Sequence, residues 1–213
     1  DQWRKMIAMY WGGVTLIDEQ IGRILHALDE LDLTDRTVVF FAADHGAFVG
    51  GHRLSDKGPA MYDDIYRIPM MVYHPGLPRG GRVCSNFVNL LDLTPTFLDI
   101  AGAPIPEAYD GRSLLPLLRG EDPPDWPEEV FAQFHGHHFP YPQRMIRTRT
   151  HKLVINPADV NELYDLRQDP NELVNRFDDP RYREVRRDLS TRLYRHLRAN
   201  NDNFYPVSYT HLT

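Results

Sequence analysis

The chain has 213 residues, of which 42% are hydrophobic and 25% charged, so there is ample apolar material to exclude disorder of the whole chain. No apolar run approaches the ~20 residues of a membrane span. The formal net charge of −6 argues against a nucleic-acid-binding protein, and a single cysteine, Cys84, excludes both an internal disulfide framework and a cysteine-built zinc site.

The first predicted element is a long amphipathic helix. Apolar residues recur every three or four positions along it, at Met6, Tyr10, Val14, Ile17, Ile21, Leu25 and Leu28. The pattern begins without a capping residue, a start methionine or a signal peptide. We therefore expect more of the protein to precede it, and the sequence leaves the cellular compartment and the oligomeric state open.

Two short apolar runs follow, residues 37–43 and 68–73. Neither alternates with polar residues, which is typical of a strand buried on both faces, as in a parallel sheet covered by helices. Thr94 and Pro95 predict the N-cap and first position of a short helix over residues 96–101, ended by Gly102. This alternation of helix and strand indicates an α/β sheet.

A stretch rich in proline and acidic residues, 120–127, marks the expected domain boundary, and the length favours one domain and part of another. Beyond it lie four clustered strand candidates that predict an antiparallel sheet: residues 130–134, 144–150, 151–155 and 162–166. Pro180 then introduces a basic helix over residues 182–197. We assign residues 1–122 to a first domain and 123–206 to a small α+β subdomain.

The last residues, 207–213, resemble one reading frame of an adaptor used in DNA sequencing libraries. The alternative interpretation is an ordinary frayed tail. We leave these residues out of the fold prediction.

Ionisable residues and glycines gather after the first apolar run, in Asp44-His45-Gly46 and the loop that follows. In open α/β sheets, the binding crevice lies at the carboxyl ends of strands. A carboxylate beside an imidazole can ligate a divalent cation, glycine lets the backbone come close to a ligand, and Lys57 can meet an anionic substrate. Taken alone, Asp44-His45-Gly46 favours a solvated turn with no function.

Further short motifs follow in order over about residues 6–200. They are Gly51-His52, Lys57-Gly58, Met61-Tyr62, Ile68-Pro69, Asp92-Leu93-Thr94-Pro95-Thr96 with Gly102, Asp110-Gly111-Arg112-Ser113-Leu114, His151-Lys152-Leu153-Val154, Glu162-Leu163-Tyr164-Asp165-Leu166 and Asp169-Pro170-Asn171-Glu172-Leu173. Together with Asp44-His45-Gly46 they resemble the second half of a type I sulfatase catalytic domain. Several ordered motifs are more specific than any one of them.

The resemblance implies the alkaline-phosphatase-like fold, an α/β fold whose mixed, mostly parallel sheet is flanked by helices. Residues 1–122 would hold the C-terminal part of that catalytic domain. Asp44 would be a carboxylate ligand of the active-site Ca²⁺, with His45 beside it in the ligand set. Many family members have asparagine at this position; because imidazole is a softer ligand than an amide oxygen, Mn²⁺ is the alternative ion. Lys57 would bind a sulfate oxygen, and His52 would either line the site or be a supporting or surface residue.

The family nucleophile is a formylglycine made from cysteine or serine within Cys/Ser-x-Pro/Ala-x-Arg. Cys84 is followed by Ser85-Asn86-Phe87-Val88, which does not match, and no serine fits either. The paired aspartates that complete the family's metal site are also absent. We expect both to lie upstream of Asp1, so the 213-residue chain alone should be inactive. Cys84 is then expected to be a buried small apolar residue.

The resemblance therefore predicts part of an enzyme that hydrolyses a small-molecule or carbohydrate sulfate ester. One alternative is a phosphonate monoester or phosphodiester hydrolase of the same superfamily. The other is a catalytically idle relative that binds sulfated glycans.

Two other clusters carry weaker hypotheses. A metal site at His135, His137 and His138 lacks carboxylate or cysteine partners, so we favour a substrate-facing loop. Arg144, Arg147 and Arg149 are expected to share one face of an edge strand, where they would be solvated or, as the alternative, bind an anion.

Overall fold

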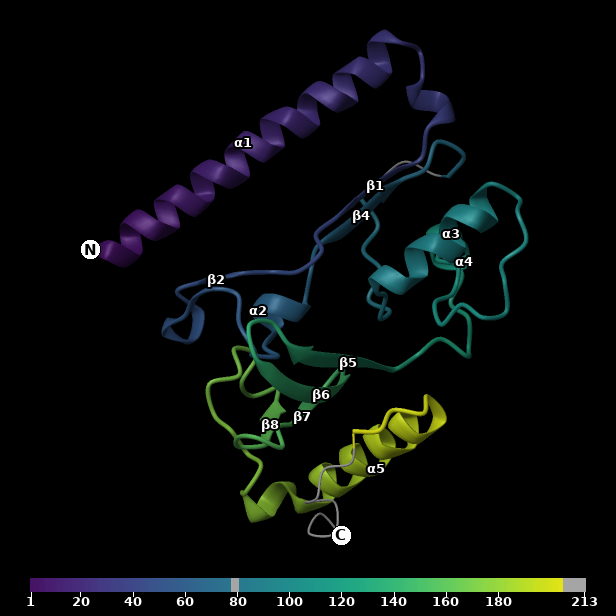
Figure 1. Ribbon diagram of the computed structural model, residues 1–213. Helices are drawn as coiled ribbons and strands as arrows, with labels where there is room; N and C mark the ends of the chain where they lie inside the picture. Colours follow the sequence, from purple (N-terminus) through teal and green to yellow (C-terminus); the bar gives the residue numbers. More distant parts are fainter. Residues whose placement is uncertain (78–80, 205–213) are drawn as a thin grey trace. The chain divides into compact units, whose positions relative to one another are not determined.

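The computed structural model describes residues 1–77 and 81–204, which divide into two compact units (Figure 1). The first comprises Asp1–Lys57 and Asp64–Trp126, and the second comprises Gly58–Asp63 and the described residues from Pro127 onward. The chain therefore enters the second unit after Lys57 and returns to the first at Asp64, a detour that the sequence pattern did not indicate. Residues 207–213 lie outside the described residues.

The predicted amphipathic helix is present as α1 (Gln2–Glu30). None of its residues is buried, and on its apolar face Tyr10 is 45% exposed and Ile17 59%. A short 3₁₀ turn (Thr34–Arg36) leads from it into the first strand. No helix within residues 1–77 and 81–204 combines the length and apolarity needed to cross a bilayer.

Both apolar runs of the first unit form strands, β1 (Val39–Ala42) and β4 (Met70–Tyr73). They pair with each other antiparallel, with Val39 opposite Tyr73 and Ala42 opposite Met70, and β1 is only partly buried. The expectation of parallel strands buried on both faces was therefore wrong for this pair, because an apolar run does not specify strand direction. The Phe40 ring of β1 meets the edge of Phe97 at a centroid distance of 5.0 Å.

The region after β4 begins with a 3₁₀ turn (Leu90–Asp92), followed by α3 (Leu93–Ile100) and α4 (Leu115–Arg119). Our N-cap prediction at Thr94 was wrong. Asn89 and Asp92 form a capping box that starts the helical turns earlier, and proline is tolerated in a first turn. Gly102 does end the helix, at a φ of +67°.

Asp92 and Thr96 of this region connect two of the sequence motifs. The buried Asp92 carboxylate accepts the Arg112 backbone N–H at 2.9 Å, and the Thr96 hydroxyl accepts the Leu114 N–H at 2.8 Å. A Cβ on Gly111 would lie 2.1 Å from the Leu91 carbonyl oxygen, so only glycine fits there. These motif residues thus hold the segment before α4 against α3.

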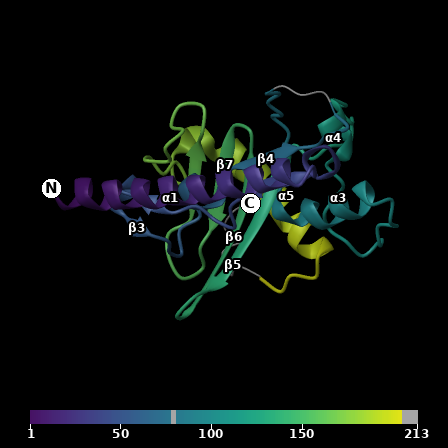
Figure 2. The same ribbon diagram turned by 90° about the horizontal axis from the view of Figure 1, so that it is seen from above.

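The second unit contains the predicted antiparallel sheet. Its strands run in the order β5-β6-β7-β8, and β5 and β6 continue past the shorter β7 and β8 (Figure 2). Their bounds are Glu129–Gly136, Pro140–Thr148, His151–Ile155 and Glu162–Asp165. A 3₁₀ turn (Pro180–Tyr182), capped by Asp179, then leads into α5 (Arg183–Ala199), close to the predicted bounds.

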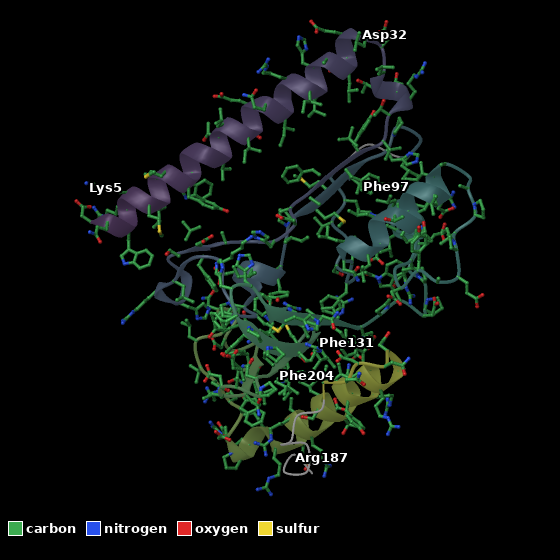
Figure 3. The ribbon with its side chains drawn as sticks, viewed as in Figure 1. Lys5, Asp32, Phe97, Phe131, Arg187 and Phe204 are labelled. Atoms are coloured by element: carbon green, nitrogen blue, oxygen red, sulfur yellow. The ribbon has the colours of Figure 1, made fainter. Side chains whose placement is uncertain are left out.

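Helix α5 packs on this sheet through an apolar core. The core residues are Ile146, Leu153, Ile155, Leu163, Leu189, Leu193 and Leu197. Phe131 and Phe204 pack against them, while Arg187 points away from the sheet (Figure 3). The leucines recur every four positions, which places them on one stripe of the helix.

The expectation for the arginines was wrong. Arg144 and Arg147 lie an odd number of residues apart on β6, so their side chains point to opposite faces, and β6 is an inner strand. Arg144 is buried against Asp202, Arg147 pairs with Asp63, and Arg149 is exposed beyond the end of β6. Ion pairs with Asp202 and Asp63, on opposite faces of β6, therefore take the place of the expected solvated face.

We expect Leu193→Ala to lower the free energy of unfolding by about 2–5 kcal/mol, because it opens a cavity beneath α5 at a residue that is 3% exposed. Urea unfolding of the chain, followed by circular dichroism, measures the change. Arg195→Ala, on the exposed side of the same helix, is the control and should stay within ~0.5 kcal/mol. Equal effects at both positions would contradict the packing described above.

Candidate active site

Asp44, His45 and Lys57 lie together directly beyond β1. His45 Nδ1 lies 2.7 Å from the Gly46 carbonyl oxygen, which can only accept a hydrogen bond, so the partners assign the proton to Nδ1. Nε2 therefore presents its lone pair, and Lys57 Nζ donates to it at 2.8 Å. The Asp44 Oδ2 atom lies 3.6 Å from the same Nε2. The structure thus brings together three of the four predicted site residues.

A tight hairpin returns Lys57 to His45. Strands β2 (Phe48–Val49) and β3 (Ser55–Asp56) pair with Phe48 opposite Asp56, across a 3₁₀ turn (Gly51–Arg53). Gly50 has a φ of +104°, which favours glycine. His52, Arg53 and Asp56 also have positive φ, at 52°, 60° and 66°, and such residues cost ~1–3 kcal/mol each and cluster at functional sites.

His52 has its own neighbours in this hairpin. Its side chain is 12% exposed, its Nε2 lies 3.9 Å from Asp64 Oδ2, and its ring meets the edge of Phe48 at 6.1 Å. These contacts place His52 between Phe48 of β2 and Asp64 of α2 (Asp63–Tyr66). Its role in lining the site stays a prediction.

Two glycines let the start of α2 (Asp63–Tyr66) come close to this loop. The Gly46 N–H donates to the Ile65 carbonyl oxygen at 2.8 Å, and a Cβ on Gly46 would lie 1.9 Å from the Asp64 carbonyl oxygen. A Cβ on Gly51 would lie 2.8 Å from the Asp64 carboxylate. Sequence reasoning missed Asp64, because nothing in its local pattern distinguishes it from Asp63.

The Asp44 and His45 side chains are accessible, with 85% and 38% of their surfaces exposed. A carboxylate oxygen and an imidazole lone pair are suitable donors for a divalent metal. Within the described ranges, however, no group of three or more His, Cys, Asp or Glu side chains is placed to hold an ion. Asp44 and His45 alone therefore do not make a complete metal site, and their role as ligands stays a prediction.

The other sequence candidates lie elsewhere. The rings of His137 and His138 meet edge to face at 4.4 Å near the β5–β6 turn. Like Asp44 and His45, these described histidines do not belong to a group of three or more side chains placed to hold a metal ion. Cys84 is exposed, contrary to our expectation of a buried residue. It lies in a stretch without helix or strand, beside Val83, which is 90% exposed.

We expect Gly46→Ala to destabilise the protein by about 1–3 kcal/mol, because the new methyl group must displace the Asp64 carbonyl oxygen. Gly58→Ala is the matched control, since a Cβ there meets no heavy atom within 4 Å. Thermal unfolding of both variants measures the difference. If the two variants unfold at the same temperature, the close approach at Gly46 is absent in solution.

Residues 50–199 of the chain match a family model described as N-sulphoglucosamine sulphohydrolase, C-terminal. The chain is 32% identical to an N-acetylglucosamine-6-O-sulfatase of Bacteroides thetaiotaomicron, over 91% of this chain and 36% of that protein. The chain thus spans less than half the length of this relative.

Two solved structures are similar over 91% of this chain. One holds its substrate, D-glucosamine-2-N,6-O-disulfate, with a TM-score of 0.83, 30% identity and 40% of that chain covered. The other is a phosphonate monoester hydrolase of Agrobacterium radiobacter, with a TM-score of 0.82, 31% identity and 41% covered. These matches confirm the alkaline-phosphatase-like fold. The chain belongs to the type I sulfatase family, of which it covers a C-terminal part.

Proposed function

We propose that the complete protein hydrolyses a sulfate ester carried by a carbohydrate. The observation that carries this proposal is the contact of Lys57 with His45 beside Asp44, in a chain of the sulfatase family. The similar N-acetylglucosamine-6-O-sulfatase, and the similar structure with a sulfated glucosamine, support a sulfated sugar as the substrate class.

Lys57 has the chemistry to hold the anion. An ammonium group has three N–H donors, and one of them is used by His45 Nε2. The other two can meet oxygens of a sulfate group, and the exposed position of Lys57 lets a ligand reach them. In the reaction, this cation would stabilise the charge that develops on the transferring group.

Asp44 and His45 are the residues of this chain that would hold a divalent metal. Ca²⁺ is the proposed ion and Mn²⁺ the alternative, and the ion would supply further positive charge for the sulfate oxygens. The bond from Nδ1 to the Gly46 carbonyl orients the imidazole and leaves the lone pair on Nε2. A metal bound there would replace Lys57 as the partner of Nε2, because that nitrogen has a single lone pair, and all three N–H groups of Lys57 would then be available to the sulfate. The nucleophile and the remaining ligands would come from the rest of the protein.

A phosphonate monoester or phosphodiester hydrolase is the second candidate. It is favoured by the similarity to the Agrobacterium enzyme, which matches this chain about as well as the sulfatase structure does. Both reactions need a cation at Lys57 and a metal, so these residues do not discriminate between them. Parallel assays with matched aryl sulfate, phosphonate and phosphodiester substrates distinguish the two reactions.

In the complete protein, Lys57→Ala should lower kcat/KM for an aryl sulfate by ~10²–10³, the scale of losing one charge-stabilising donor. Release of the chromogenic alcohol measures the rate. Lys5→Ala, which removes an exposed lysine of α1, is the control and should leave the rate unchanged. Full activity of Lys57→Ala would exclude the proposed role, and faster turnover of the phosphorus esters by the parent protein would favour the second candidate.

His45→Asn should lower the affinity for Mn²⁺ more than that for Ca²⁺, because an amide oxygen replaces the softer imidazole nitrogen. Calorimetric titration of the metal-free complete protein with each ion gives the two dissociation constants. Asp44→Asn serves as the comparison. It removes a negative charge that would attract either ion, so it should lower the affinities for both Mn²⁺ and Ca²⁺. An unchanged Mn²⁺ to Ca²⁺ affinity ratio in His45→Asn would show that His45 is not a ligand.

A further inference from the structure

The β2–β3 hairpin of the first unit contains three residues other than glycine in the left-handed backbone region. The φ values are 52° at His52, 60° at Arg53 and 66° at Asp56. This region is unfavourable for a residue with a Cβ, so such a conformation persists only where the surrounding structure imposes it, and it is found mainly at functional sites. Each of the three residues therefore needs a reason for its conformation.

Closure of the hairpin accounts for two of them. His52 and Arg53 lie in the 3₁₀ turn between the strands. There the Arg53 N–H donates to the Gly50 carbonyl oxygen at 3.1 Å, which helps to reverse the chain. Asp56 lies outside this turn, so closure of the hairpin does not explain its conformation.

Asp56 is the last residue of β3. Its backbone is paired with Phe48 of β2, which is buried at 3% exposure, whereas Asp56 itself is exposed. A residue in the extended conformation would carry the strand straight on, but a φ of +66° turns the chain out of the strand direction. The turn at Asp56 therefore sets the course of the chain beyond the hairpin.

The residue that leaves this turn is Lys57. It is the last residue of the first unit before the chain enters the second unit at Gly58, so within the first unit the backbone reaches Lys57 only through Asp56. The Lys57 Nζ atom donates to His45 Nε2 at 2.8 Å. The backbone conformation of Asp56 thus governs where the Lys57 side chain begins, and with it the reach of the ammonium group to His45.

Aspartate suits this position better than glycine or a branched residue. Aspartate and asparagine tolerate the left-handed region, whereas a β-branched residue is a steric outlier there. Glycine adopts positive and negative φ about equally readily, so it would allow the turn without holding it. Aspartate therefore permits the turn and still restricts the backbone to a small region.

We propose that Asp56 is a positioning residue for Lys57, and that it acts through its left-handed backbone and not through its carboxylate. It turns the chain at the end of β3 so that the Lys57 ammonium group lies beside His45, where it meets the anionic group of the substrate. This inference rests on the proposed function of Lys57 as the residue that binds the sulfate.

The test uses three variants of Asp56 in the complete protein. Asp56→Asn removes the charge but keeps the tolerance of a left-handed backbone, and Asp56→Val disfavours that backbone. Asp56→Gly relieves the strain but frees φ. The acylation rate of the Lys57 amine, followed by mass spectrometry, is measured together with kcat/KM for an aryl sulfate and the unfolding temperature.

Asp32→Val is the matched control. Asp32 is also an aspartate with a left-handed backbone, at a φ of 51°. It follows α1, at the opposite end of that helix from Lys5 (Figure 3). The hairpin lies by the other end of α1, since a Cβ on Gly50 would meet the Trp3 ring at 3.5 Å. The control therefore makes the same change away from Lys57.

Asp56→Val and Asp32→Val should both lower the unfolding temperature, because each places a branched side chain in the left-handed region. Of these two, only Asp56→Val should speed acylation of Lys57, which is no longer held to His45. It should also lower kcat/KM by ~10–10²-fold, the scale of misplacing a binding group. Asp56→Asn should retain the acylation rate and kcat/KM of the parent protein. Asp56→Gly should keep the unfolding temperature and still speed acylation, an effect that lost stability alone does not give.

Equal effects of Asp56→Asn and Asp56→Val would assign the role to the carboxylate and overturn the proposal. So would an unchanged acylation rate in both Asp56→Val and Asp56→Gly, or an equal change in Asp32→Val. If the parent protein hydrolyses no sulfate ester, the proposed function fails, while the acylation rates still decide whether Asp56 positions Lys57.

Discussion

A buried lysine between two carboxylates organises the second unit. Lys152 lies in the middle of β7, whose five residues are all buried, and it can be accommodated there only because Asp63 and Glu172 neutralise it. Those carboxylates come from segments far apart in the chain. One lies before β4 and the other follows β8, so the ion contacts draw the segment Gly58–Asp63 into a unit formed mainly by residues from Pro127 onward. Apolar packing of α5 on the sheet supplies the core, and the charges specify which segment joins it.

A second constraint is conformational and concerns the first unit. Lys57 reaches His45 because the chain reverses within a hairpin that has positive φ values at Gly50 and at several non-glycine residues. Gly46 and Gly51 leave room for the start of α2, whose backbone lies against the loop. A Cβ at either position would push the start of α2 away from the loop. The local strain is thus located where the candidate site is.

The proposed metal site would need donors beyond Asp44 and His45. Asp44 and His45 offer one carboxylate and one imidazole, whereas Ca²⁺ usually takes six to eight oxygen ligands. The chain also spans only 36% of the length of the N-acetylglucosamine-6-O-sulfatase it resembles. Under the proposed function, these residues would supply an anion-binding lysine and part of a metal site, and the rest of the protein would supply the remaining groups.

The sequence by itself determined the family and the main elements, and it singled out three candidate site residues that the structure brings together. Periodicity was sufficient for α1 and α5, because a single amphipathic face has a regular spacing, and the ordered motifs identified Asp44, His45 and Lys57. Strand direction in the β1–β4 pair, the cap at Asn89 and the faces of Arg144 and Arg147 were decided by tertiary structure. Lys152 was a visible signal, since a lysine within an apolar strand needs buried partners. Its partners could be found only in the folded chain, because Asp63 and Glu172 are brought to it by contacts between residues distant in sequence.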